Sequence, residues 1–432
     1  MTDSTRRFST RSLTLLVIAS MIGAGVYTTS GFALADLGSP IWVMVAWMIG
    51  GLIAICGAIA YGGLAQSLCE SGGEYLYLSR FAHPVAGFIA GWVSLLAGFT
   101  SAGAFAAIAF AAYAVPNSND PNGISAAIIA VGLVMICMVM HGTSVHHGLL
   151  GQDWLVMLKL LTLGVFLVST LALTDRWHGF DEKANTQTPS FAALLTSVMW
   201  VSLSYCGFNA SIYVAGASEK KGMSVARSLW LGTVIVTAIY LALNVVFMFA
   251  PSNDVISGEK DIATITAGVL GGNTLASVIR VAICLGLASS VSSVLLTGPK
   301  VYQQMATDGL FPQRIASPNN RSSPRRLVVF QGVAMIVVIL VADLRSLLSY
   351  LSLTLSLSAA ATVATLWLPE LRRHQSTTVL FSSSVFIAAT LTIAIVASWR
   401  QPGEALAAMA TLVSGVFAYF IIKRPSAQSN PF

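Results

Sequence analysis

The chain is an almost unbroken succession of apolar stretches, each about as long as a bilayer is thick, joined by short polar connections. A helix needs roughly 20 mostly apolar residues to cross the hydrocarbon core, and such windows recur along the whole sequence. Of the 432 residues, 56% are apolar and only 9% are charged. A soluble domain carries about 25% charged residues. The sequence therefore predicts an all-α membrane protein and excludes a soluble, disordered or disulfide-stapled chain.

Twelve such windows are bounded by charged residues, prolines or polar clusters. The predicted spans are 12–36, 41–67, 84–115, 122–140, 152–173, 190–217, 228–250, 274–297, 327–342, 344–367, 377–397 and 404–422. The join between the ninth and tenth is the least distinct, so eleven to thirteen spans fit the pattern. The connections are too short to bury a core of their own, so residues 1–432 form a single membrane domain.

The basic residues of the connections fall unevenly on the two sides of the membrane. With twelve spans both termini share one side, whose connections carry sixteen Lys and Arg residues against five on the other. The sixteen are Arg6, Arg7, Arg11, Arg80, Lys220, Lys221, Arg227, Lys300, Arg314, Arg321, Arg325, Arg326, Arg372, Arg373, Lys423 and Arg424, and the five are Arg176, Lys183, Lys260, Arg345 and Arg400. The positive-inside rule then predicts cytoplasmic N- and C-termini, in a plasma (inner) membrane. The net charge of +6 is a topology signal, so no nucleic-acid partner is expected.

Two spans are interrupted by glycine halfway along their length. The first carries Gly23 and Gly25 in its middle, and the sixth carries Gly207, which lies 184 residues after Gly23. That separation is about the length of five spans, and an odd number of spans inserts the second unit upside down. The pattern predicts a five-plus-five inverted repeat with discontinuous helices 1 and 6. The repeats are 12–173 and 190–367, followed by two accessory helices in 377–422.

Interrupted helices in a bilayer predict a polar guest. An unwound stretch frees backbone N–H and C=O groups that hydrocarbon cannot satisfy, so these groups must face a cavity. The N-terminal end of a half-helix carries partial positive charge that suits a carboxylate, and the carbonyls at the opposite broken end suit an ammonium. A zwitterionic α-amino acid offers both groups at one carbon.

Four motifs resemble those of the amino acid–polyamine–organocation transporters. They are Ile22-Gly23-Ala24-Gly25-Val26-Tyr27, the stretch from Ser71-Gly72-Gly73-Glu74-Tyr75-Leu76-Tyr77 through Pro84 to Trp92, Gly207-Phe208-Asn209 with Ser218-Glu219, and Gly298-Pro299-Lys300-Val301-Tyr302 with Asp308 to Pro312. Together they cover nearly the whole chain in the order of the family. Asn209 after Gly-Phe is similar to the L-type amino acid exchanger branch and its bacterial permease relatives, whereas the arginine/agmatine antiporters typically place a glutamate there.

The resemblance implies a secondary active transporter that works by alternating access, without enzyme activity or a cofactor. The family site would place the substrate amine and carboxylate on the backbone of Met21, Ala24 and Gly25, with carbonyls of Leu203 and Cys206 completing the amine site. Leu203 stands where relatives often carry a bulky aromatic gate. The predicted substrate-binding residues are Met21, Ile22, Gly23, Ala24, Gly25, Leu203, Cys206, Gly207, Phe208 and Asn209. For Asn209, capping of the second half-helix is the alternative to substrate contact.

Lys159 lies inside the fifth predicted span and bears on which ion drives transport. Charge in hydrocarbon costs at least about 2.5 kcal/mol, so Lys159 needs a partner. It either snorkels inward to the membrane surface or reaches the junction of spans 1 and 8, near the carbonyls of Ser20 to Ile22. Similar proton-dependent, sodium-independent family members have a lysine at this position, so sodium independence is expected. The predicted coupling residues are Lys159, Ser289, Ser290 and Ser293, while Ser289 and Ser290 bonding back to their own helix is equally compatible with the sequence.

The acidic residues all lie in or near the predicted connections, leaving no span-core carboxylate to match a cationic side chain. We therefore expect a neutral L-amino acid as substrate, moved by exchange or proton symport. The other partners expected are protons and the lipid bilayer, and no partner subunit is identified. The cluster of Glu70, Glu74, Arg80 and Glu219 forms either an ion-paired inner gate or a solvated loop surface.

Two alternatives from other classes stay open at this point. A polyamine or cationic amino acid carrier would need an acidic partner, and it would be favoured if Glu70 or Glu74 turned into the cavity. A channel, membrane sensor or membrane enzyme is the second alternative. An enzyme would need a nucleophile–base pair or a metal cluster, and the sequence offers neither at a credible spacing.

Overall fold

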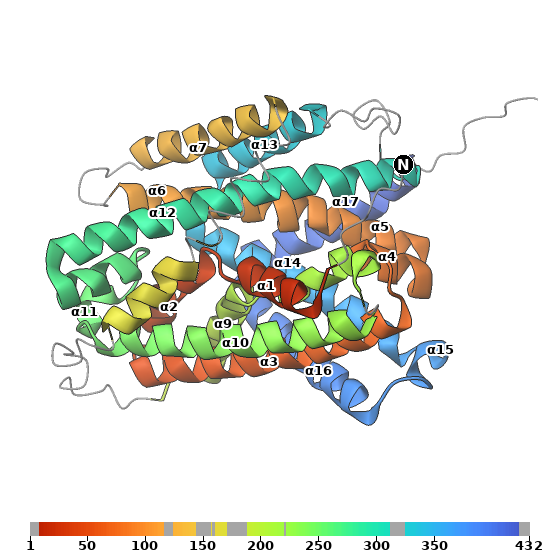
Figure 1. The fold of residues 1–432 in the computed structure, drawn as a ribbon, viewed down its shortest axis with the longest axis horizontal. Helices are drawn as coiled ribbons and strands as arrows, with labels where there is room; N and C mark the ends of the chain where they lie inside the picture. The colour runs from red at the N-terminus through yellow and green to blue at the C-terminus, as the bar shows by residue number, and fades with distance from the viewer. Residues whose placement is uncertain are drawn as a thin grey trace, which may run out of the picture.

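The computed structural model describes residues 8–115, 124–143, 157, 160–170, 188–219, 222–311 and 325–422. Long helices run side by side along the length of the molecule (Figure 1). Within the described ranges, the β pairing consists of one isolated bridge between Phe8 and Ser218. The prediction of an all-α protein is confirmed.

Apart from residues at their ends, the twelve predicted spans are helical where the structure describes them, except at residues 22–24 of the first and 205–209 of the sixth. The longer elements are α1 (Thr10–Met21), α2 (Gly25–Leu37), α3 (Pro40–Ser67), α5 (Pro84–Val93), η2 (Ser94–Ser101), α6 (Ala102–Ala114), α7 (Ile124–Thr143), α9 (Phe191–Ser204), η5 (Ala210–Ala217), α10 (Gly222–Phe249), α12 (Ile262–Thr307), α13 (Arg325–Val341), α14 (Leu344–Ala364), α16 (Thr377–Arg400) and α17 (Pro402–Ile422). The fifth predicted span contributes the helix Leu160–Thr170. Short elements connect them: α4 (Gly73–Tyr77), η1 (Leu78–Ala82), α11 (Asn253–Ile256), η6 (Thr365–Trp367) and α15 (Pro369–Arg372).

Length and hydropathy single out the helices that can cross a bilayer. Among the described residues, eight helices are long and apolar enough, and nine are when the bent pair α1 and α2 counts as one span. The three other predicted spans correspond to shorter pieces, namely Leu160–Thr170, α9 with η5, and α13. The protein is therefore a multi-pass membrane protein.

The predicted eighth span ends too early. It was expected over 274–297, and α12 covers Ile262–Thr307 with non-helical backbone at Gly271 and Gly272. Gly272 adopts a positive φ of 67°, which an L side chain disfavours, so the chain kinks there and a second helix begins close to the predicted start. This helix continues past 297 to Thr307, because Pro299 and Lys300 end the apolar window without ending the helix.

The packing places the second half of each broken span beside the first half of the other. α2 packs on α9, and α1 packs on η5. The long helices α3 and α10 lie side by side and support these four elements (Figure 1). A second group is formed by α6 against α12 and by α7 against α13. Trp47 of α3, Tyr205 and Tyr240 of α10 are almost fully buried where the first group meets.

Candidate functional site

Both predicted interruptions are present as breaks in the helices. α1 ends at Met21 and α2 starts at Gly25, and the two helices are bent by 44° relative to each other. α9 ends at Ser204, residues 205–209 form turns, and the chain continues from Ala210 as the 3-10 helix η5. The prediction that helices 1 and 6 are discontinuous is confirmed.

The two breaks pack directly against one another through glycine. Gly207 adopts φ 102°, and a Cβ at this position would lie 2.7 Å from the carbonyl oxygen of Ser20. A Cβ on Gly25 would lie 2.5 Å from the Oγ of Ser204 and 2.9 Å from its Cα. Real Cβ atoms do not approach other atoms so closely. Glycine is therefore required for the two backbones to meet at this depth.

A buried tyrosine joins the broken ends. The hydroxyl of Tyr240 lies 2.7 Å from the carbonyl oxygen of Met21 and 3.0 Å from that of Ser204, and it donates toward both. These carbonyls close the half-helices α1 and α9, where helical partners run out. The hydroxyls of Thr29 and Ser204, 3.2 Å apart, add a second link between the two spans. Sequence reasoning missed Tyr240, because a single tyrosine in an apolar span has no distinguishing pattern.

The predicted substrate residues divide into a covered and a part-exposed group. The covered group comprises Met21, Ile22, Ala24, Gly25 and Phe208, and the half-buried group comprises Gly23, Leu203, Cys206, Gly207 and Asn209. The carbonyl of Leu203 accepts backbone hydrogen bonds from the N–H of Cys206, at 3.0 Å, and from the N–H of Tyr205. The accessible surface at the two breaks therefore comes from Gly23 in the first span and from the half-buried residues of the sixth.

A buried carboxyl group lies beside the second break. Glu74 of α4 is 7% exposed. Its Oε1 accepts hydrogen bonds from the Tyr61 hydroxyl at 2.5 Å and from Asn209 Nδ2 at 3.2 Å, and its Oε2 accepts one from the Ser358 hydroxyl at 3.2 Å. Burial raises the pKa of Glu74 above its usual value, and the three hydrogen bonds oppose that rise.

This carboxyl corrects the interpretation of the acidic cluster. Glu74 belongs neither to an ion-paired gate nor to a solvated surface, because α14 and the sixth span cover it and neutral donors satisfy it. Glu70 does form an ion pair with Arg80, at 3.9 Å and with both side chains more than half exposed. Asn209 makes no side-chain cap of η5; its amide donates to Glu74 instead.

The C-terminal half of the sixth span is also held by the N-terminal segment and the connection after α3. The backbone N–H of Glu219 donates to the Phe8 carbonyl at 3.0 Å, and the Ser211 hydroxyl donates to the Leu13 carbonyl at 3.2 Å. The backbone N–H of Gly216 donates to the Ser71 hydroxyl at 3.1 Å. The half-helices α1 and η5 are therefore fastened to one another by polar backbone contacts.

Charged side chains contact the other halves of the two spans, α2 and α9. Arg400 binds Asp36 at the end of α2 through two hydrogen bonds, of 2.7 and 2.9 Å. The Arg345 guanidinium lies 4.9 Å from the centre of the Trp200 ring in α9, and Trp200 Nε1 donates to the Ser349 hydroxyl at 2.8 Å. These five residues line one pocket of about 480 Å³, together with Asp343, Ser346, Gln401, Pro402 and Glu404.

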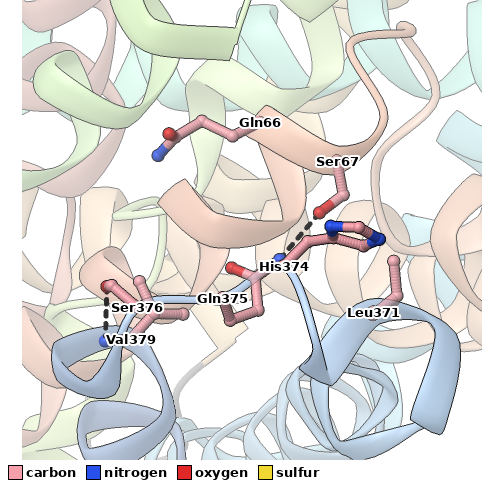
Figure 2. A pocket seen from close by; sticks show the side chains of 7 residues that line it. All are labelled: Gln66, Ser67, Leu371, His374, Gln375, Ser376 and Val379. Atoms are coloured by element: carbon pink, nitrogen blue, oxygen red, sulfur yellow. Dashed lines mark hydrogen bonds between the residues drawn. The ribbon is translucent and has the colours of Figure 1, made fainter.

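A second pocket, of about 550 Å³, lies at the opposite end of the molecule, where α3 ends. Figure 2 shows its lining, which comes from the end of α3 and from the segment between α15 and α16. Gln375 Nε2 donates to the Ser67 hydroxyl at 2.9 Å, and Ser376 caps α16 through the Val379 N–H. Neither of these two pockets includes a residue of the breaks, so neither coincides with the predicted substrate site.

The predicted coupling residues are only partly described. Ser290 donates to the carbonyl of Gly286 at 3.1 Å, so it bonds back to its own helix as the alternative interpretation had it. Ser289 is buried in α12 and Ser293 is half-buried. Lys159 lies outside the described residues, so its place near the first break stays a prediction.

Comparison with known proteins places the chain among transport proteins. A family model described as "Amino acid permease" matches residues 8–431. Human "Large neutral amino acids transporter small subunit 2" is 21% identical over 421 residues, covering 94% of this chain and 78% of that protein. Human "Asc-type amino acid transporter 1" is 24% identical over 372 residues, covering 83% and 69%. "Serine/threonine exchanger SteT" of Bacillus subtilis (strain 168) is 24% identical over 294 residues, covering 67% and 66%.

Proposed function

The chain belongs to the amino acid permease family, and from this premise we propose that it is a secondary active transporter of neutral L-amino acids that works by alternating access. The family match confirms the resemblance drawn from the motifs, and its relatives are transporters rather than enzymes. The observation that carries the proposal is the pair of touching breaks, with the hydroxyl of Tyr240 on the last carbonyls of both half-helices.

The chemistry of the breaks supports a zwitterionic substrate. The N-terminus of α2, at Ala24 and Gly25, provides backbone N–H groups and partial positive charge for a carboxylate. The carbonyls at Met21, Leu203 and Cys206 provide partial negative charge for an ammonium. In this proposal Ile22, Gly23, Gly207, Phe208 and Asn209 complete the lining. Recognition by main-chain atoms leaves the substrate side chain free of a charged partner, as a neutral amino acid requires.

The names of these relatives support the same substrate class. They refer to large neutral amino acids and to a serine/threonine exchanger. A cationic substrate would instead need a free carboxylate in the site. Glu74 is 7% exposed and already accepts three hydrogen bonds from protein groups, so it lends no support to the cationic alternative.

We further propose the orientation and coupling that the sequence predicts. The N- and C-termini face the cytoplasm of a plasma (inner) membrane, and the repeats 12–173 and 190–367 are inverted relative to each other. The pairing of α2 with α9 and of α1 with η5 supports this, because two spans that cross in opposite directions place the second half of one beside the first half of the other. Transport is sodium-independent and proceeds by exchange or proton symport, with Lys159 near Ser289 and Ser293 in the place of a sodium ion.

Counterflow in vesicles containing the purified protein tests the proposal. We expect preloaded neutral L-amino acids to drive uptake of a labelled one, without sodium. Gly25→Val should abolish this uptake, because its Cβ would collide with the Ser204 backbone. Gly132→Val is the matched control, since a Cβ there meets nothing within 4 Å, and it should transport normally. Undiminished counterflow in Gly25→Val, or saturable uptake of cationic but not neutral amino acids, contradicts the proposal.

A further inference from the structure

Glu74 connects the sixth span to helices that do not break. Its carboxyl group receives hydrogen bonds from α3 through Tyr61, from the second break through Asn209, and from α14 through Ser358. The ring of Tyr61 also contacts the ring of Phe208 edge to face, with the centroids 5.7 Å apart. Glu74 therefore contacts Asn209 directly and Phe208 through the ring of Tyr61.

The donors around Glu74 are all uncharged. The titratable side chains that interact with it electrostatically are Tyr61 of α3, Cys206 at the break and Tyr213 of η5, and each is neutral near pH 7. Arg80 of η1, on the element that follows α4, pairs with Glu70 instead. In the described part of the chain, no Lys, Arg or His forms an ion pair with Glu74.

A carboxyl group in such a place is poised to bind a proton. Burial without a cation disfavours the charged form and raises the pKa of Glu74, while the hydrogen bonds favour the charged form. Removing even one of the three donors shifts the balance further toward protonation. The position of Asn209, and with it the sixth span, thereby becomes linked to the protonation of Glu74.

We propose that Glu74 is a proton-binding site of this transporter, separate from the role proposed for Lys159, and that its contacts with Asn209 and Ser358 form a latch that protonation releases. This inference rests on the proposed function and makes its coupling specific. A proton from water on the outer side adds to a carboxylate oxygen, and the neutral acid loses its electrostatic attraction for the two donors. η5 then separates from α14, the proton leaves to cytoplasmic water, and the carboxylate takes up the donors again.

Accumulation driven by a pH gradient measures this step directly. If one proton moves with each neutral substrate, a gradient of one pH unit supports about tenfold accumulation, by the same free energy that one pKa unit represents. We expect Glu74→Gln to lose this accumulation and to equilibrate the substrate only, while still performing counterflow at a reduced rate. Glu70→Gln is the matched control: it removes an exposed carboxyl four residues away and should accumulate substrate as the wild type does.

Tyr61→Phe provides an independent readout if Glu74→Gln fails to fold. It removes the donor at 2.5 Å but keeps the ring, so the neutral acid is favoured and the pH midpoint of uptake should move to more alkaline values. The inference is overturned if Glu74→Gln still accumulates substrate tenfold, if the midpoint in Tyr61→Phe does not move, or if the wild type accumulates nothing in a pH gradient. Failure of the proposed function is distinct from these outcomes, because the wild type would then show no counterflow of neutral amino acids.

Discussion

The two ends of the broken spans are held together by different kinds of chemistry. At the end proposed to face outward, called the outer end, Arg400 pairs with Asp36, with 35% and 12% of their side chains exposed, and Arg345 covers the Trp200 ring. At the end proposed to face the cytoplasm, called the inner end, the buried carboxyl of Glu74 is bound by hydroxyl and amide donors. One end thus depends on opposite charges within reach of solvent, and the other on a single titratable group away from it.

Because the contacts differ, salt and protons should act on different ends of the two spans. An ion pair within reach of solvent is screened by salt, so the contact between Arg400 and Asp36 weakens as the ionic strength rises. A buried carboxyl responds to protons and little to salt, because the protein shields it. We infer that the outer end opens readily for substrate, whereas the inner end opens when Glu74 gains a proton.

The largest effect is expected where the two breaks touch, between the outer and inner ends. Gly207→Ala forces a side chain into φ 102° and places a Cβ 2.7 Å from the Ser20 carbonyl. Backbone strain of this kind costs about 1–3 kcal/mol before the collision is counted, so uptake should fall by more than about tenfold. Measurement of counterflow in vesicles, with Gly132→Ala as control, checks this. Normal counterflow in Gly207→Ala would show that the breaks need not touch.

The next effect is a pH dependence of stability that belongs to the inner end alone. Because the pKa of Glu74 is raised in the folded protein, its contribution to stability is fully present below the usual carboxyl pKa. That contribution is lost as the pH rises through the raised value. The Tm of the purified protein should therefore fall over that range, and Glu74→Gln should flatten the fall. An identical Tm profile in wild type and Glu74→Gln would remove the inner half of the comparison.

Ser358→Ala sharpens the same point with a smaller change. It removes one hydrogen bond to Glu74, worth about 0.5–1.5 kcal/mol, which corresponds to about one pH unit at most. The pH midpoint of uptake should move to more alkaline values, in the direction expected for Tyr61→Phe but less far. A shift toward acid pH would mean that Ser358 does not stabilise the carboxylate.

The smallest effect is expected at the outer end. Asp36→Asn breaks the bidentate pair with Arg400, which should change the KM for external substrate by less than about fivefold. The effect should shrink at about 1 M salt, where the Debye length falls to about 3 Å. Uptake measured at low and high salt checks this, with Glu74→Gln as the comparison whose defect persists. A defect in Asp36→Asn that salt does not change would contradict the contrast.

The sequence predicts the breaks but not what holds them. Gly23, Gly25 and Gly207 interrupt apolar windows, and that local pattern is enough to locate two unwound turns. Tyr240 gives no such pattern, because its role depends on two carbonyls brought together by packing. The C-terminal end of α12 was placed too early, because hydropathy marks the part of a helix inside the bilayer and not the full extent of the helix.

Glu74 shows why a polar connection can be misread. Its neighbours Gly72 and Gly73 and its place between two apolar windows favour a solvated loop. Burial comes instead from α14, whose Ser358 lies 284 residues further along the chain, and from Asn209 beside the second break. No local pattern carries contacts of that separation, so the interpretation as a loop surface or ion-paired gate was wrong for Glu74, although Glu70 and Arg80 do form an exposed ion pair.

We propose that main-chain atoms of the two breaks bind both charged ends of a neutral amino acid. Competition in the counterflow assay tests it most directly, using one unlabelled L-amino acid beside its carboxyl amide and its decarboxylated amine. Backbone recognition of both groups predicts that only the intact amino acid competes with the labelled substrate. Equal competition by the decarboxylated amine would contradict the account.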